Sequence, residues 1–318
     1  MEIFTSIIAL AAIFLALKFI SDEIEESATA LAIKIKIPAS VAGATLLAIA
    51  SSAPEFFTAT NSAIFFRVFE IGLQTIVWSA IFNVLVIFGF SSIFAKKNLK
   101  LPKKGIGRDL LFYLATILFL AFAIFDGNIS RTESVALIVF YIFYIAVLFF
   151  GKKEFDENEK LEKINQENWK IFFTFTGGIS AIGFLCHSMI ENGLSLAENL
   201  NLPIAVISAL IFSIGTSLPD LFLSVAAAKK GNGAGAIANI FGSNTFDIAI
   251  GLGIPILIVG QTEVEKSQIN SSITLLFLSV LFVAFMIFQN WKTSKIKGFL
   301  SLSAFFIMIT WFLFTNIN

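Results

Sequence analysis

Residues 215–220 read Gly-Thr-Ser-Leu-Pro-Asp, a cluster of hydroxyls, a proline and a carboxylate inside an apolar segment long enough to cross a membrane. Residues 50–55, 165 positions earlier, read Ala-Ser-Ser-Ala-Pro-Glu, so that the hydroxyls, the proline and the acid superimpose. A second pair follows at an interval of 164: residues 79–83 read Ser-Ala-Ile-Phe-Asn and residues 243–247 read Ser-Asn-Thr-Phe-Asp. A two-part motif that occurs twice indicates a duplicated half, and the polar residues of both halves are expected to meet at one site.

The composition indicates an integral membrane protein. The chain of 318 residues is 57% hydrophobic, contains 38 Phe and has only 14% charged residues, far from the average of soluble domains. The apolar runs have the length of membrane-spanning helices and lack the alternation of an outer-membrane barrel. The lone Cys186 excludes an intramolecular disulfide, no basic stripe suggests nucleic acid, and the start Met1-Glu2 lacks the positive region of a signal peptide.

We therefore predict an all-α membrane protein with ten transmembrane helices in two inverted five-helix repeats, with broken helices at the ion site. The spans are expected at 3–20, 38–66, 70–95, 109–126, 132–150, 169–190, 203–228, 234–259, 269–289 and 298–315. An odd number of spans in each half forces opposite orientations, as in many secondary transporters. The expected units are residues 1–150 for the first repeat, 151–168 for a cytoplasmic linker and 169–318 for the second repeat.

The basic residues give an orientation. Of the 22 Lys and Arg residues, 19 fall in the joins that follow odd-numbered spans, and the other face has only Arg67, Arg131 and Lys266. Because cytoplasmic loops carry an excess of Lys and Arg, both termini are predicted outside the cell. We expect a multi-pass protein of the plasma membrane, with membrane lipid and inorganic cations as its partners. The acidic cluster at 22–26 is expected at the cytoplasmic interface after the first span, with Asp22 either there or deeper.

Local chemistry points to a cation site. Pro54 and Pro219 have no N–H, so the carbonyls of Ala50 and Gly215 lose their helical partners, and the residue before each proline is expected to leave helical geometry. Irregular backbone at membrane depth is expected where it lines a binding cavity. Each of the four motifs places a hydroxyl and a carboxylate or carboxamide four residues apart, on one helix face. These hard oxygens suit Ca2+, Na+ or K+ and argue against zinc, copper or iron.

Charge limits the ions further. Glu55 and Asp220 together balance one Ca2+ ion, and an unpaired carboxylate at mid-membrane costs several kcal/mol. Asp247 is then surplus and is either protonated or ionised opposite an additional monovalent cation. Asn83 is its neutral counterpart, so the site is expected to be symmetric in shape and asymmetric in charge. The single histidine, His187, is more simply a packed side chain than a proton carrier.

The motifs resemble the two alpha-repeats of the cation/calcium exchanger superfamily, in the segments 51–57, 75–83, 215–220 and 242–247. Within this sodium/calcium exchanger family they are most similar to the potassium-dependent sodium/calcium exchangers. The resemblance implies an antiporter that exports Ca2+ against inward Na+, with no cofactor and with K+ co-transport left open. It implies an ion site made of Glu55, Asp220, Ser51, Ser52, Thr216, Ser217, Ser79, Asn83, Ser243 and Asp247, with backbone oxygens near Ala48 and Ser213.

The sequence also departs from the pattern of that family. Trp78 stands where Gly is usual, Gln74-Thr75 replaces a common Gly-Asn or Gly-Thr, and Ala50 replaces the first-repeat Gly. A bulky Trp beside the site would affect stoichiometry, access or the ion carried. In the implied mechanism the first and sixth spans move against a core of spans two, three, seven and eight. The alternatives are a Ca2+/H+ exchanger of the same fold, an intramembrane aspartyl enzyme using Asp220 and Asp247, and a passive cation channel.

Overall fold

The structure is a computed structural model that describes residues 2–35, 43–150, 167–260, 262–264 and 266–317. It is helical apart from two strands of two residues each, β1 (Asn128–Ile129) and β2 (Thr262–Glu263), which pair antiparallel. The helices, with π-helical turns labelled η, are α1 (Glu2–Lys34), η1 (Gly43–Leu47), α3 (Ala48–Ser51), α4 (Ala53–Ile64), α5 (Phe69–Phe82), η2 (Asn83–Ile87), α6 (Phe88–Phe94), α7 (Lys103–Ala123), α8 (Arg131–Phe150), α9 (Asn168–Leu200), α10 (Ile204–Ile207), η4 (Ser208–Phe212), α11 (Ser213–Thr216), α12 (Leu218–Lys229), α13 (Gly233–Phe246), η5 (Asp247–Leu252), α14 (Gly253–Val259), α15 (Lys266–Asn290) and α16 (Lys295–Ile317).

These lengths confirm an all-helical membrane protein. Within the described ranges, 8 helices are long and apolar enough to cross a membrane, or up to 9 if the bent pair Ile204–Thr216 and Leu218–Lys229 counts as one span. The second expected span, 38–66, begins in residues 36–42, which lie outside the description, as does most of the expected linker 151–168. The count of ten spans stays a prediction.

The first and sixth spans are longer than the sequence predicted. The helices α1 and α9 have 33 residues each, which corresponds to about 50 Å and exceeds the hydrocarbon layer of about 30 Å. The two helices pack against each other along their length. The acidic cluster at 22–26 therefore lies within α1 and not after it, because the α1–α9 contact continues the helix beyond its apolar run.

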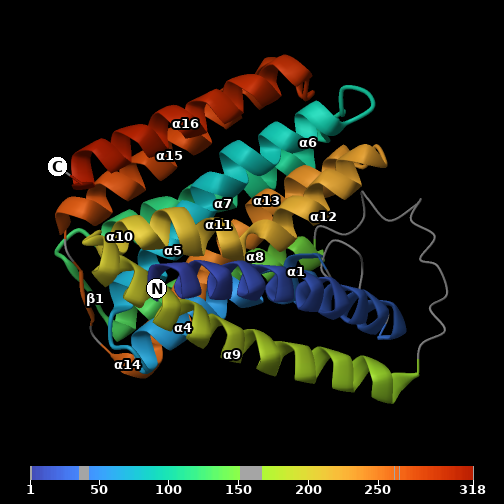
Figure 1. The fold of residues 1–318 in the computed structure, drawn as a ribbon. Helices are drawn as coiled ribbons and strands as arrows, with labels where there is room; N and C mark the ends of the chain where they lie inside the picture. Colours follow the sequence, from blue (N-terminus) through green and yellow to red (C-terminus); the bar gives the residue numbers. More distant parts are fainter. Residues whose placement is uncertain (1, 36–42, 151–166, 261, 265, 318) are drawn as a thin grey trace.

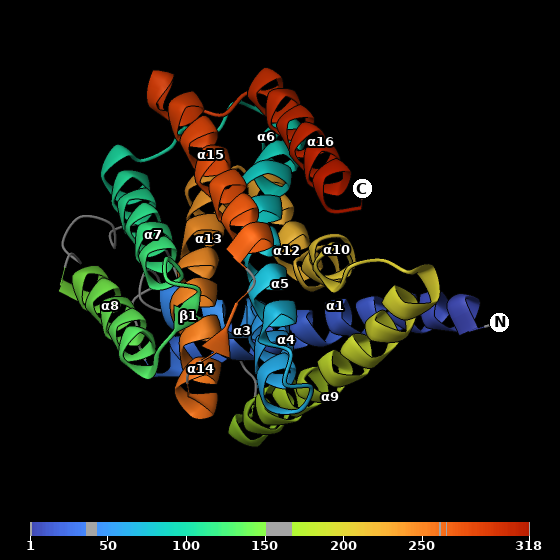
Figure 2. The ribbon, with the colours of Figure 1, turned by 90° about the vertical axis from the view of Figure 1, so that its left-hand side faces the viewer.

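The molecule is arranged around α5 and α13, which pass through its middle (Figures 1 and 2). On one side lie α1 and α9, and on the opposite side lie α15 and α16. The span Phe69–Phe94 is almost completely buried, whereas most of α1 and α9 faces outward. The central helices are thus shielded by other helices, and α1 and α9 form an outer pair.

Two helix breaks have the same geometry. The first separates α3 from α4 at Ser52 (φ −92°, ψ 6°), and the second separates α11 from α12 at Ser217 (φ −83°, ψ −1°). The second break bends its span by 45°. The sequence placed the break one residue too late, because Ala53 and Leu218 already begin the next helix. Proline then occupies the second helical position, where its missing N–H costs no hydrogen bond.

The π-helical turns mark the same places in both halves. The turns η1 and η4 precede the two breaks, and η2 and η5 begin at Asn83 and Asp247. Their starts are separated by the same intervals of 165 and 164 residues as the sequence motifs. A π-helical turn inserts one residue into a helix and is often found at functional sites. It rotates the side chains that follow, and no hydrophobic pattern in the sequence indicated it.

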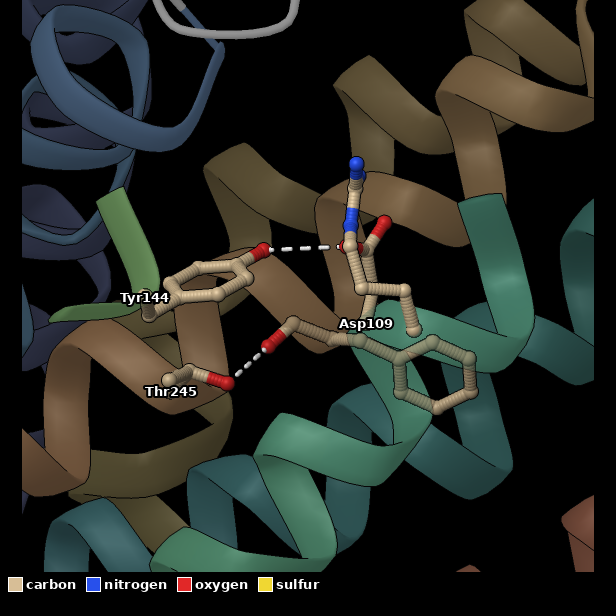
Figure 3. A network of polar contacts seen from close by, with 5 residues as sticks. Asp109, Tyr144 and Thr245 are labelled. Atoms are coloured by element: carbon tan, nitrogen blue, oxygen red, sulfur yellow. Dashed lines mark hydrogen bonds and ion pairs between the residues drawn. The ribbon is translucent and has the colours of Figure 1, made fainter. Parts of the chain in front are cut away.

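Polar contacts hold the peripheral helices in place. The hydroxyl of Tyr144 on α8 donates to Oδ1 of Asp109 on α7 at 3.3 Å, and Arg108 pairs with the same carboxylate at 2.9 Å (Figure 3). Thr245, also shown there, donates to the carbonyl of Phe241 within α13. Gly215, at the second break, permits a close approach of α1, because a Cβ atom there would overlap the ring of Phe14.

Candidate ion-binding site

The two acids that follow the helix breaks meet in the interior. Glu55 lies in the first turn of α4 and Asp220 in the first turn of α12, where the partial positive charge of a helix N-terminus favours a carboxylate. Their side chains are 0% and 1% exposed. They lie close enough to interact electrostatically although they are 165 positions apart. This is the juxtaposition that the duplicated motif predicted.

Hydroxyls of two other helices contact Glu55. Its Oε1 atom accepts hydrogen bonds from Ser79 Oγ on α5 at 3.2 Å and from Ser217 Oγ at the second break at 3.3 Å. The two hydroxyls are 2.7 Å from each other, and Thr216 lies beside the same carboxylate. The acid of one half is therefore held by the broken helix of the other half.

Asparagine side chains hold Asp220. Asn83 Nδ2 donates to Oδ2 at 3.3 Å, and Asn239 Nδ2 donates to Oδ1 at 3.2 Å. Ser51 and Ser243 lie beside the same carboxylate. Both carboxylate oxygens thus have an amide donor, from α13 on one side and from the start of η2 on the other.

A second layer supports Asn83. Its Nδ2 also donates to Oδ1 of Asn244 at 2.9 Å, and Asn244 Nδ2 donates to the Tyr113 hydroxyl at 3.1 Å and to the Ala80 carbonyl at 3.3 Å. The amide group of Asn83 is therefore oriented with its oxygen free, because the nitrogen already serves two acceptors.

Several buried oxygens at this site have no hydrogen-bond partner. They are Ser51 Oγ, Ser52 Oγ, Glu55 Oε2, Asn83 Oδ1 and both Oδ atoms of Asp247. Ser52 lies beside Asp247, which interacts electrostatically with both other acids. A buried oxygen without a partner is costly, and a dehydrated cation is a partner that satisfies several of them at once.

The chemistry of the donors restricts the cation. In the part of the chain that the structure describes, no group of three or more His, Cys, Asp or Glu residues forms a metal cluster, and no ion pair with Lys, Arg or His involves the three acids. The acids are instead separated by hydroxyls and carboxamides. Hard oxygen ligands of this kind fit Ca2+ and the alkali cations.

The two predicted backbone ligands already have partners. The Ser213 carbonyl accepts from Ser217 N and Thr216 Oγ1, and the Ala48 carbonyl accepts from Ser52 N. A carbonyl oxygen has a second lone pair. A ligand role for the two backbone oxygens, like that of the whole predicted set, stays a prediction.

Sequence reasoning missed Asn239, Asn244 and Tyr113. A signal for Asn239 was present, because Asn239, Ser243 and Asp247 recur at intervals of four, which predicts that they share one helix face. Tyr113 comes from α7, a segment without any repeated motif, and nothing in the sequence indicated its contact.

The expectation that the Trp78 ring lies beside the site is wrong. Trp78 is fully buried, donates its indole N–H to Ser272 Oγ on α15 at 3.2 Å and packs on Phe312 of α16 with ring centroids 4.6 Å apart. Ser272 in turn donates to Gln74 Oε1 at 2.9 Å. Neighbouring residues of a helix point in different directions, so Ser79 faces the acids while Trp78 faces α15 and α16.

With this geometry in place, comparison with known proteins is informative. The sequence model of the family described as "Sodium/calcium exchanger protein" matches residues 5–150 and 170–314. The chain belongs to the sodium/calcium exchanger family. Its members are transporters, which excludes the alternative of an intramembrane aspartyl enzyme.

Curated relatives match parts of the chain. Sodium/potassium/calcium exchanger 2 of Gallus gallus is 34% identical over 153 residues, which cover 46% of this chain and 24% of the relative. Sodium/potassium/calcium exchanger 1 of Homo sapiens is 34% identical over 152 residues, 45% of this chain and 14% of the relative. The matches thus span less than a quarter of these relatives. An uncharacterized membrane protein of Methanocaldococcus jannaschii is 28% identical over 273 residues, 85% of each chain.

Solved structures share the fold. The sodium-calcium exchanger NCX_Mj, soaked with Na+ and Sr2+, superimposes with a TM-score of 0.68 at 23% identity, covering 97% of this chain and 98% of that one. The H+/Ca2+ exchanger CAX superimposes with a TM-score of 0.78 at 12% identity, covering 98% and 86%. These similarities show that this protein shares the fold of NCX_Mj and of CAX.

The support that Asn239 gives to Asp220 can be tested. We expect Asn239→Ala to weaken binding of Ca2+ by about tenfold or more, since removing a group that orients a ligand costs that much at other metal sites. Equilibrium binding of radioactive Ca2+ to the purified protein measures it. Asn199→Ala, at an exposed position of α9, is the matched control. Equal affinity of both variants would contradict the role of Asn239.

The orientation of Trp78 gives a second prediction. Trp78→Phe removes the hydrogen bond to Ser272 and keeps an aromatic ring against Phe312, so we expect the free energy of unfolding to fall by about 1 kcal/mol with cation affinity unchanged. Thermal denaturation and radioactive Ca2+ binding measure the two quantities. Trp311→Phe, at a residue 48% exposed on α16, is the control. A change in cation affinity would place the ring at the site after all.

Proposed function

We propose that this protein is a secondary antiporter that exchanges Ca2+ for Na+ by alternating access. The observation that supports this most strongly is the group of buried, partnerless oxygens that the two helix breaks and the two motif ends bring together. Family membership supports the same function. The proposed ligands are the side chains that the sequence predicted, with Glu55 and Asp220 as the central pair.

Exchange follows from sharing one set of oxygens. We call the proposed set of ligands around Glu55, Asp220 and Asp247 the cage. Na+ and Ca2+ have similar radii, so the same cage accepts either one calcium ion or several sodium ions. Because their positions overlap, binding of the two ions is competitive. The charges of Glu55 and Asp220 balance one Ca2+. A loaded cage is more nearly neutral than an empty one, and crossing of the membrane interior therefore favours the loaded forms.

Asp247 is the residue on which a requirement for K+ would depend. Its two carboxylate oxygens are buried without a partner, and Asn83, its counterpart in the first half, carries no charge. A monovalent cation beside Asp247 would balance the third acid. The curated relatives named sodium/potassium/calcium exchangers make K+ the first candidate for that cation.

For the architecture we propose ten spans in two inverted repeats, residues 1–150 and 169–318, joined by the cytoplasmic linker 151–168. The broken segment 43–64, the second span in chain order, would raise the count from 9 to ten. The repeated breaks and π-helical turns support the repeats, and the family model matches two separate segments. Loops expected on the same face also pair: β1 with β2, and Lys100 with Lys292.

We assign the movement that produces alternating access to the helices α1 and α9. These two helices pack mainly on each other and face outward over much of their length. The core that holds the acids is almost completely buried. Sliding of the α1–α9 pair along this core would expose the cage to one membrane face at a time without disturbing the ligands.

A Ca2+/H+ exchanger of the same fold is the second candidate. The higher of the two TM-scores, 0.78, belongs to the H+/Ca2+ exchanger CAX, although a fold shared at 12% identity does not choose the counter-ion. Three buried acids in one cage offer positions for protons as well as for Na+. A passive channel is the third candidate and would need no counter-ion.

Transport driven by separate gradients distinguishes these candidates. In proteoliposomes we expect radioactive Ca2+ uptake to follow an outward Na+ gradient, and Glu55→Gln and Asp220→Asn each to lower it by more than about tenfold, because each removes a charged ligand. Asp247→Asn is expected to remove any stimulation by K+. Asp126→Asn, at an exposed loop carboxylate, is the control.

The outcomes of this experiment are distinct. Uptake that ignores Na+ and follows a proton gradient would assign Ca2+/H+ exchange. Uptake that needs no counter-ion and does not saturate would assign a channel. Uptake that persists in both Glu55→Gln and Asp220→Asn would contradict the proposed site itself.

We further propose that the protein lies in the plasma membrane with both termini outside the cell, because the basic residues concentrate in the odd joins. In a Cys186→Ala background, we expect Glu2→Cys to react with a membrane-impermeant maleimide on intact cells. Lys97→Cys, in the connection from α6 to α7, is expected to react only after permeabilisation. The reverse pattern would invert the topology.

A further inference from the structure

The helix α1 carries a buried acid that the central site does not use. Glu25 is 9% exposed and lies within the 33-residue helix α1, and its Oε1 atom has no hydrogen-bond partner among the described residues. Its exposed neighbours Glu23 and Glu26 face away from the core. Glu25 is therefore the one member of the acidic cluster at 22–26 that the fold places inside the protein.

Two oxygens on this face of α1 have no partner. Glu25 Oε1 and Ser21 Oγ are both buried without a hydrogen bond, and Ser21 is 0% exposed. Residues four apart lie one turn apart on the same helix face, so the carboxylate and the hydroxyl are neighbours. No Lys, Arg or His of the described chain forms an ion pair with Glu25.

The position of Glu25 relates it to the cage. The helix α1 packs against α3 and α12, which carry Ser51 and Asp220. Glu25 interacts electrostatically with Asp220, while both oxygens of Asp220 are taken by Asn83 and Asn239. Lys18, two turns before Glu25, is paired with Asp22 and lies over the Phe222 ring of α12. The described surroundings of Glu25 thus include a second acid, and the lysine two turns before it on α1 is already engaged.

We propose that Ser21 and Glu25 form a cation-binding position on α1, separate from the central cage and adjacent to Asp220. One carboxylate matches one monovalent charge, and carboxylate and hydroxyl oxygens are ligands for an alkali cation. The position lies in the C-terminal half of α1, on the helix assigned to the moving pair. A cation bound there waits between the cage and the membrane face at which α1 ends.

Direct binding tests this position independently of transport. In the purified full-length Glu55→Gln/Asp220→Asn variant, whose central cage is disabled, we expect saturable binding of radioactive Na+ to remain. Adding Glu25→Gln should lower its affinity by about tenfold or more, and adding Glu23→Gln, the same change on the exposed face of α1, should not. Absence of saturable Na+ binding, or equal affinity with and without Glu25, would overturn the proposal.

A second measurement keeps the test valid if the double variant does not fold. In proteoliposomes with an intact cage, Glu25→Gln is expected to raise the half-saturating Na+ concentration by about tenfold on the face at which α1 ends and to leave it unchanged on the other face. Glu23→Gln should change neither. No shift, or equal shifts on both faces, would overturn the cation-binding position at Ser21 and Glu25. Transport by the wild-type protein that does not depend on Na+ at all would overturn the proposed Na+/Ca2+ exchange. It would leave the result of the Na+ binding experiment unaffected.

Discussion

The structure depends on the cost of burying oxygen atoms in a place where no water can reach them. Three carboxylates, two partnerless serine hydroxyls and a free amide oxygen lie buried in the interior of the protein. Each of these groups is unfavourable alone, and ionised acids without a counter-charge are the most unfavourable of all. Cations bound as proposed would offset this cost, and the integrity of the core would then be coupled to ion binding.

Irregular helices make this arrangement possible. The breaks at Ser52 and Ser217 place an acid in the first turn of a new helix, and the π-helical turns at Asn83 and Asp247 change which side chains face inward. A continuous α-helix would satisfy its own backbone and point fewer side chains at one spot. Because the hydroxyl donors to Glu55 come from both halves, neither half forms the site without the other.

The outer pair α1 and α9 has a different relation to the site from the central helices. It contributes packing, through Phe14 against Gly215 and Cys186 Sγ against the Pro54 carbonyl at 3.4 Å. Among the hydrogen bonds of the described residues, none joins α1 or α9 to the central acids. These contacts are compatible with the proposed movement of α1 and α9 along the core. Glu25 is the one acidic residue of α1 in this layer that is buried, beside the buried hydroxyls of Ser21 and Ser27.

The sequence by itself determined the membrane class. It also predicted a duplication and named most of the polar groups that meet, because repetition of residue types at fixed intervals survives without coordinates. It located Glu55 and Asp220 and paired them correctly. Only the tertiary structure decided where side chains point. It turned Trp78 toward α15, extended α1 past the acidic cluster, moved each break to a serine and brought Tyr113 and Asn239 to the site. These features depend on contacts between distant segments and on π-helical turns, which leave no periodic signal in the chain.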